Sequence, residues 1–216
     1  MTISRNRRLL LAPLAGLALL AGCGGHSSKT TTNANGCTTV KAPAAATRTA
    51  PRPTTALASG ESYDVTMQTN CGSFTFRLDQ AQSPHAAASF VSLVRHGFFD
   101  KTVFHRIVPG FVIQGGDPTQ TGGGGPGYET VDKPPAGATY SHGVVAMAKT
   151  GAEAAGTAGS QFFVVTEKNA GLPPDYAIIG KVTSGLDVVD RIGKLGNPQE
   201  QPTAVVEIEH ASVKSS

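Results

Sequence analysis

Residues 104–119 read Phe-His-Arg-Ile-Val-Pro-Gly-Phe-Val-Ile-Gln-Gly-Gly-Asp-Pro-Thr, and this stretch decides the fold more than any other part of the chain. Residues two apart in a strand share a face, so Phe104 and Arg106 are expected to point the same way. The Pro-Gly turn in the middle folds the chain back and should bring Phe111, Ile113 and Gln114 toward Arg106. The stretch therefore predicts a guanidinium group beside an apolar floor, with an amide near enough to hold it.

The rest of the chain predicts a mostly β domain. Alternating residues over 63–69 and 74–78, separated by Asn-Cys-Gly, indicate a β-hairpin. Ser83-Pro84 is typical of a helix start, with Ser as the N-cap, and an apolar spacing predicts a second helix over about 186–194. Further strands are expected at 103–107, 111–115, 144–148, 162–166, 178–182 and 204–213. Eight strands and two helices suit a closed antiparallel β-barrel capped by two α-helices, since closure removes exposed edges.

A second stretch narrows the fold to a family. Residues 159–166 read Gly-Ser-Gln-Phe-Phe-Val-Val-Thr, Met-Ala stands before them at 147–148, and Ile-Gly-Lys-Val follows at 179–182. A glycine-rich run occupies 121–128. Together with the first stretch, these motifs resemble the cyclophilin-type peptidyl-prolyl cis-trans isomerases in order and spacing over residues 62–213. The resemblance implies proline-containing polypeptides as substrates, with no cofactor and no metal.

The resemblance also implies roles for individual residues. Arg106 would be the catalytic hydrogen-bond donor, Gln114 would hold it, and His105 would be structural. The pocket for the proline ring and the substrate chain would be formed by Phe111, Val112, Phe163 and Leu172, by Gln161 with the backbone of Ala148 and Lys149, and by Tyr176 at the rim.

Three departures from the family pattern stand out. The chain has no Trp. The family position often held by Trp falls at Gly171, and one that is His in many members falls at Tyr176. The segment between Met147 and Ser160 is about three residues longer than in typical compact members. Catalysis should survive these changes, whereas inhibition by cyclosporin is expected to be weak because the missing ring would supply an N–H and buried area.

The N-terminus predicts export. Arg5, Arg7 and Arg8 precede an apolar run over 9–21, which is too short to span a bilayer comfortably and suits a signal-peptide core. The run ends in Leu-Ala-Gly-Cys at 20–23, which resembles the bacterial lipobox. We therefore expect a signal peptide at 1–22 and a lipidated Cys23 that anchors the protein on the extracytoplasmic face of a bacterial cell membrane. The alternative is an ordinary secretory signal with a chance cysteine.

A tether should follow the anchor. Residues 24–60 contain nine Thr, eight Ala and three Pro and no aromatic residue, which favours disorder over 23–60 and an isomerase domain over 61–216. With Cys23 lipidated, Cys37 and Cys71 remain, an even number in an oxidising compartment. We expect a disulfide between them, with two free thiols as the alternative. The bridge would leave a free tether of residues 24–36 with a reach of roughly 20 Å.

The charge balance and the absence of certain motifs argue against several other functions. Residues 1–22 carry three of the 18 basic residues and no acidic one, so the processed chain would have 15 of each. This balance argues against nucleic acid as a partner. The glycine-rich run lacks the Gly-Lys-Ser/Thr of a phosphate-binding loop, the six His show no metal-ligand spacing, and Ser141-His142 belongs to no readable triad.

Three acidic residues, Asp117, Glu129 and Asp132, are interpreted as loop charges rather than as an acid/base pair. A monomer is expected. The rival to an isomerase is a non-catalytic proline-peptide binding module or a holdase chaperone, which would grip exported chains without catalysis.

Overall fold

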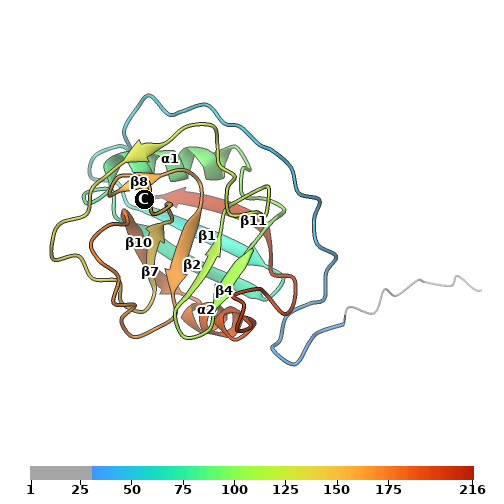
Figure 1. Ribbon diagram of the computed structural model, residues 1–216. Coiled ribbons are helices and arrows are strands. Elements are labelled where there is room, and N and C mark those ends of the chain that lie inside the picture. The colour runs from blue at the N-terminus through green and yellow to red at the C-terminus, as the bar shows by residue number, and fades with distance from the viewer. Residues whose placement is uncertain (1–30) are drawn as a thin grey trace, which may run out of the picture.

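The computed structural model describes residues 31–216, so the predicted signal peptide and Cys23 lie outside the described residues (Figure 1). Nine strands form one curled antiparallel sheet in the order β3-β11-β1-β2-β10-β7-β9-β5-β4, and β6 pairs with β8 in a small second sheet. The strands are β1 (Tyr63–Thr69), β2 (Gly72–Leu78), β3 (Thr102–Val103), β4 (Arg106–Val108), β5 (Val112–Gly115), β6 (Thr130–Val131), β7 (Val144–Met147), β8 (Thr157–Ala158), β9 (Phe162–Val165), β10 (Ile178–Ser184) and β11 (Glu207–Ser215). The predicted mostly β architecture with two helices is confirmed.

The predicted closed eight-stranded barrel needs a correction. β3 and β4 are the two edges of the sheet, and no ladder joins them. The residues expected to form one strand over 103–107 bend at 104–105, so that β3 pairs with β11 while β4 pairs with β5. The outer edge of β4 is covered by a loop, because the N–H of Ile107 donates to the carbonyl of Glu200 (2.9 Å). The sheet is therefore a half-barrel of nine strands. Its two edge strands, β3 and β4, are connected directly by residues 104–105.

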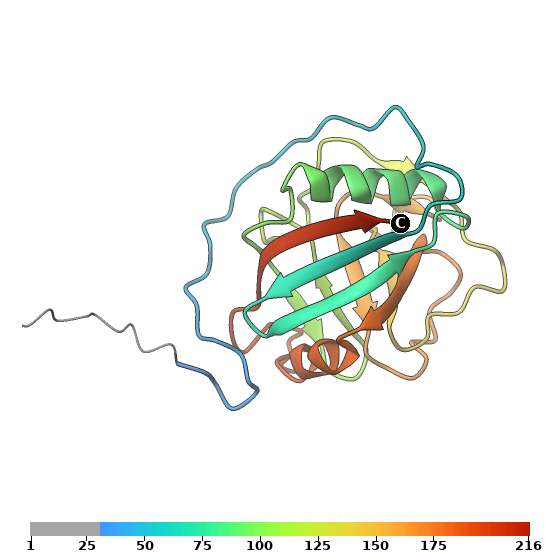
Figure 2. The same cartoon turned by 180° about the vertical axis from the view of Figure 1, so that it is seen from behind.

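The two helices lie at opposite ends of the curled sheet (Figure 2). Helix α1 (Pro84–Arg95) contacts β11 and β6, and α2 (Leu186–Gly193) contacts β2, β4 and β5. In the core Phe90 of α1 stacks on Phe99 at a centroid distance of 4.7 Å and meets Phe162 edge-on at 5.4 Å. These rings fill the concave side of the sheet, so functional side chains are left to its outer face.

The start of α1 differs from the prediction. Ser83 is at the N-cap position and Pro84 follows, but the Ser83 hydroxyl is buried and has no hydrogen-bond partner among the described residues. The Asp132 carboxylate takes the cap role: it accepts the N–H of Ala86 (2.6 Å) and contacts His85 Nδ1 (2.7 Å). Asp132 lies in the loop after β6, as predicted, but it is buried and faces the positive end of a helix.

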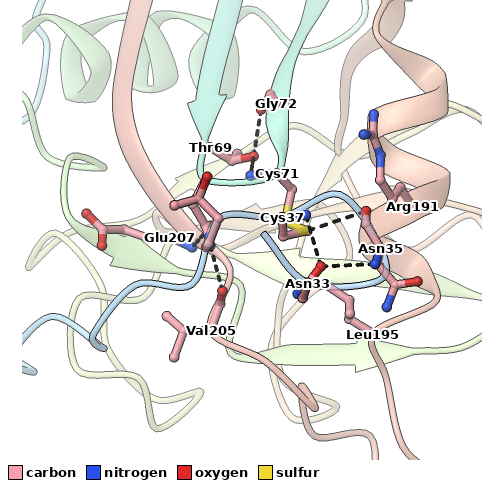
Figure 3. The surroundings of a disulfide bond; sticks show 12 residues. Asn33, Asn35, Cys37, Thr69, Cys71, Gly72, Arg191, Leu195, Val205 and Glu207 are labelled. Atoms are coloured by element: carbon pink, nitrogen blue, oxygen red, sulfur yellow. Dashed lines mark hydrogen bonds between the residues drawn. A yellow bond between two sulfur atoms is a disulfide. The ribbon is translucent and has the colours of Figure 1, made fainter. Parts of the chain in front are cut away.

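The expected disulfide is present and fixes the N-terminal segment to the end of the β1–β2 hairpin (Figure 3). Cys37 and Cys71 are both buried. Beside the bridge the Asn33 side chain accepts the N–H groups of Asn35 (3.0 Å) and Cys37 (2.9 Å), and Thr38 donates to the carbonyl of Asn70 (2.7 Å).

From the bridge onward the segment is not the disordered tether that its composition predicted. Residues 37–60, which we call the strap, pass along the outside of the domain from the end near α2 to the end near α1 (Figures 1 and 2). Arg48 donates to the carbonyls of Phe98 and Asp100, both at 2.7 Å. The order comes mainly from the disulfide and from hydrogen bonds of the backbone and of Arg48, because only Ala50 and Leu57 of the strap pack, partly buried, against the core beyond the bridge. Among residues 31–216 no helix has the length and apolar character needed to cross a membrane.

Candidate active site

Three of the predicted site residues lie in one row across three strands, and Ala146, which was not predicted, continues the row on a fourth strand. Arg106 of β4 is opposite Gln114 of β5, Gln114 is opposite Phe163 of β9, and Phe163 is opposite Ala146 of β7. Directly paired residues point to the same face of a sheet. The row therefore places the guanidinium, the amide and an aromatic ring side by side on the outer face.

Two side chains that were expected on the Arg106 side point into the core instead. Ile113 is fully buried in the core, as alternation next to Gln114 requires. Phe104 is also fully buried in the core, although it was expected to share the face of Arg106. The reason is the bend at 104–105: these residues belong to no ladder, so the alternation of a strand does not run through them.

The Arg106 side chain is held from two directions and remains 35 % exposed. Nε lies 2.7 Å from a carboxylate oxygen of Glu200, and Nη1 donates to Oε1 of Gln114 at 3.1 Å. A guanidinium has five N–H donors, so three are left over. Nη2 makes no hydrogen bond to any residue in the part of the chain that the structure describes. Sequence reasoning missed Glu200, which is far from Arg106 in the chain and sits in a loop without a motif.

Gln114 and Gln161 continue the hydrogen-bond chain away from Arg106. Nε2 of Gln114 donates to Oε1 of Gln161 (3.0 Å), and Nε2 of Gln161 donates to the carbonyls of Gly122 (2.8 Å) and Gly124 (3.0 Å). The glycine-rich loop thereby fixes the orientation of both amides, and they in turn fix Nη1 of Arg106.

An apolar floor lies beside the guanidinium. Val112 and Phe163 are buried within a cluster on the outer face, and Phe111, Leu172 and Tyr176 are half-buried against it. Phe163 and Tyr176 meet edge-on at 5.5 Å. All five predicted lining side chains are therefore brought together.

Tyr140 supports this floor from below and was not predicted. It is fully buried, and its hydroxyl donates to the carbonyl of Tyr176 (2.7 Å) and accepts the Tyr176 N–H (2.9 Å). Burial raises the pKa of the Tyr140 hydroxyl, so it stays protonated and continues to donate. No pattern in the sequence distinguishes this tyrosine from the other three.

The predicted backbone contacts lie at the edge of the same site. The Ala148 N–H is already bonded to the carbonyl of Gln161 (2.9 Å) and is not free for a substrate. The Lys149 ammonium is buried, paired with Asp175 at 2.6 Å and 5.5 Å from the centre of the Tyr176 ring. At the departure from the family pattern, Gly171 has φ +62° and no atom within 4 Å of where a Cβ would be. The rim is open there.

His105 is not placed to act as a base. Burial lowers the pKa of its imidazole, and the neighbouring Arg106 charge lowers it further while Asp117 partly opposes this. Both ring nitrogens are buried and lack hydrogen-bond partners among residues 31–216. A neutral ring that bonds to nothing in the site serves packing, as the resemblance implied.

Comparisons with known proteins agree with this geometry. The family model described as cyclophilin type peptidyl-prolyl cis-trans isomerase/CLD matches residues 64–213. The chain belongs to the cyclophilin family.

The relatives that the chain matches are named as peptidyl-prolyl cis-trans isomerases. Peptidyl-prolyl cis-trans isomerase B of Bacillus subtilis is 44 % identical over 116 residues, which is 52 % of this chain and 77 % of that protein. Peptidyl-prolyl cis-trans isomerase-like 1 of Gibberella zeae is 36 % identical over 156 residues, 69 % of this chain and 94 % of that protein. A cyclophilin crystal structure from Cryptosporidium parvum aligns with a TM-score of 0.66 and 32 % identity, covering 72 % of this chain and 99 % of that one. This cyclophilin is a peptidyl-prolyl cis-trans isomerase.

The site predicts an activity that hardly depends on pH. Arginine stays charged across the accessible range, and the lowered pKa of His105 keeps that ring neutral at neutral pH. We expect kcat/KM for a short X–Pro peptide to be flat between about pH 6 and pH 9, as no group that titrates there takes part. Rates measured across this range test it. An inflection near neutral pH that disappears in His105→Gln would show that the imidazole participates.

Proposed function

We propose that this cyclophilin isomerises X–Pro bonds in exported or cell-envelope polypeptides, with Arg106 as the catalytic hydrogen-bond donor, while a lipid on Cys23 holds it at the extracytoplasmic face of a bacterial membrane. One observation supports this chemistry most directly. Glu200 and Gln114 occupy Nε and Nη1 of Arg106, so the Nη2 side of the guanidinium can donate to a substrate next to the apolar floor of Phe163 and Phe111.

The reaction needs little more than such a donor. Resonance between nitrogen and carbonyl makes rotation about a peptide bond cost about 18–20 kcal/mol. At the twisted transition state the resonance is lost, and the proline nitrogen becomes pyramidal with an available lone pair. A donor directed at this lone pair stabilises the twisted form more than either planar form, and such differential binding accelerates the reaction.

The two anchors of Arg106 keep that donor in place. Glu200 occupies Nε and Gln114 occupies Nη1, so the guanidinium plane is fixed before a substrate arrives. The apolar floor gives a proline ring a surface to pack on. A Cryptosporidium parvum relative was crystallised in the presence of the dipeptide Ala-Pro, which supports X–Pro as the ligand here.

The location is supported by the disulfide together with the sequence before it. Disulfides persist in oxidising compartments and are rare in the cytosol, and Cys37 and Cys71 form one. The apolar run over 9–21 and the Leu-Ala-Gly-Cys at 20–23 supply an export signal and a lipid acceptor. Substrates would then be chains that have left the cytoplasm.

The proposed lipid anchor is tested by replacing Cys23, the residue that would carry the lipid. In cells, Cys23→Ser is expected to release the protein from the membrane fraction and to abolish incorporation of labelled fatty acid, with kcat/KM of the purified protein unchanged. Ser27→Ala serves as the control in the same segment and should remain membrane-bound. If Cys23→Ser stays in the membrane fraction as wild type does, the lipid-anchor proposal fails.

A further inference from the structure

One part of the strap, residues 51–56, differs from the rest of it in making no contacts that fix its backbone. These residues read Pro-Arg-Pro-Thr-Thr-Ala, and we call them the proline stretch. Within residues 31–216 none of their N–H groups, carbonyls or side chains makes a hydrogen bond or an ion pair. They form neither helix nor strand, and all of them except Pro53 are exposed. Exposed backbone of this kind is what peptide-binding sites take up.

The proline stretch is held only through its two ends. Before it, the Ala50 N–H donates to the carbonyl of Pro126 (3.0 Å). After it, the Ala58 N–H donates to the Tyr63 hydroxyl (3.1 Å), and Leu57 packs partly buried against the core. The domain therefore presents the proline stretch on its surface as a loop with fixed ends.

A cavity of about 550 Å³ lies behind the start of the proline stretch. From the strap it is lined by residues 48–51, and from the domain it is lined by residues 96–98, 100 and 101, which follow α1. The strap thus stands off from the domain at this point, and little holds the exposed Pro51 to its own molecule.

The proline stretch also carries the chemical group on which the site acts. Its two prolines form the bonds Ala50–Pro51 and Arg52–Pro53. X–Pro bonds in flexible segments populate both isomers, with about 5–30 % cis, so these two bonds have isomers to exchange. Pro43 of the same strap differs, because its carbonyl accepts Nε2 of Gln120 (2.9 Å) and is held by it.

The proline stretch does not occupy the site of its own molecule. Nη2 of Arg106 makes no hydrogen bond within residues 31–216, and the ends of the stretch are fixed at Pro126 and at Tyr63 of β1. A second copy can receive the stretch without breaking these end contacts. The processed chain would have 15 basic and 15 acidic residues, so copies do not repel one another through net charge. Copies anchored in one membrane would also meet at a high effective concentration.

We propose that the proline stretch is a substrate of this isomerase in trans: the Arg106 site of one copy binds and isomerises the Ala50–Pro51 or Arg52–Pro53 bond of a second copy. No covalent bond is made or broken, because the reaction is a rotation about the peptide bond. The contact joins two different surfaces of the same chain. This inference rests on the proposed function, since it uses the Arg106 site, and it names a second copy of this chain as a partner.

A competition assay in the full chain tests the proposal. Wild type turns over a short X–Pro peptide below its KM while an excess of a competitor is added. The competitor is Arg106→Ala, which retains the proline stretch, and the matched control is the same variant with Pro51→Ala and Pro53→Ala. At about 1 mM competitor we expect the rate to be about twofold lower than with the control, since KM values of enzymes reach about 1 mM. Both competitors share any binding of the peptide by their own apolar floor, so the difference reports the proline stretch alone.

Exchange NMR follows the two bonds themselves. In a labelled Arg106→Ala chain, catalytic amounts of unlabelled wild type should shorten cis/trans exchange at Pro51 and Pro53 from tens of seconds to about a second, and should leave Pro43 unchanged. Unlabelled Arg106→Ala added in place of wild type should have no effect. In labelled wild type alone, the exchange rate at Pro51 and Pro53 should rise in proportion to the protein concentration.

The proposal is overturned if the two competitors inhibit equally, or if wild type leaves exchange at Pro51 and Pro53 at the uncatalysed rate. An exchange rate in labelled wild type that does not depend on protein concentration also overturns it, because each molecule would then isomerise its own stretch. Failure of the proposed function is recognised separately, since wild type would then not turn over the short peptide at all.

Discussion

Arg106→Ala is expected to lower kcat/KM for X–Pro peptides by about 10²–10³-fold, the usual loss when one preorganised donor to a transition state is removed. Nothing else in the described site can replace it: Gln114 and Gln161 are committed to each other and to the glycine-rich loop. The folded state should change little, since Arg106 is part-exposed and its ion pair with Glu200 is at the surface. A spectroscopic isomerisation assay together with thermal melting measures both quantities.

The matched control is Arg77→Ala on β2. Arg77 makes a two-pronged pair with Asp64 at 3.0 and 2.9 Å and lies outside the site, so its removal should leave kcat/KM unchanged. Arg106→Lys keeps the charge but loses the planar group, and we expect it to be nearly as inactive as alanine. Full activity of Arg106→Lys would show that charge alone suffices. Retained peptide binding by Arg106→Ala would show that the apolar floor binds without catalysing.

Removing the disulfide with Cys37→Ala and Cys71→Ala is expected to cost about 4 kcal/mol in the free energy of unfolding, because the bridge closes a loop between residues 34 apart. The midpoint of thermal unfolding should fall by about 10 °C. Part of the effect should appear as release of the strap, whose first anchor is the bridge. Denaturant unfolding measures the free energy, and proteolysis within residues 37–60 reports the strap.

Wild type treated with a reductant is the control for this pair of substitutions. It retains both side chains and lacks only the bond, so its stability should fall nearly as far as that of the double variant. If the reduced wild type is as stable as the oxidised protein, the bridge does not stabilise the fold, and any loss in the variant comes from the cavities left by two buried sulfurs.

The motifs predicted most of the site because residues at a fixed spacing around a turn become direct neighbours when the two strands pair. Arg106 and Gln114 face each other across a tight turn, and Phe163 is the next residue in the same row. The same reasoning failed at Phe104, where a bend outside any ladder changes the face of the side chain. It also could not find Glu200 or Tyr140, which reach the site from loops and carry no local pattern.

The strap shows a different limit of sequence reasoning. A count of apolar residues predicts disorder wherever no core can form, and few side chains of residues 37–60 contribute to the core. Its order depends instead on backbone donors meeting the carbonyls of Pro118 and Pro126 and on Arg48 meeting those of Phe98 and Asp100. Such pairings depend on tertiary position, which composition does not encode.

The most direct test of the central claim is the cis/trans exchange rate of a short X–Pro peptide, measured by magnetisation-transfer NMR with catalytic amounts of wild type and of Arg106→Ala. Uncatalysed exchange takes tens to hundreds of seconds, so catalysis is unmistakable. We predict fast exchange with wild type and exchange near the uncatalysed rate with the variant. A folded wild type that leaves the rate unchanged, or an Arg106→Ala that matches wild type, would contradict the account.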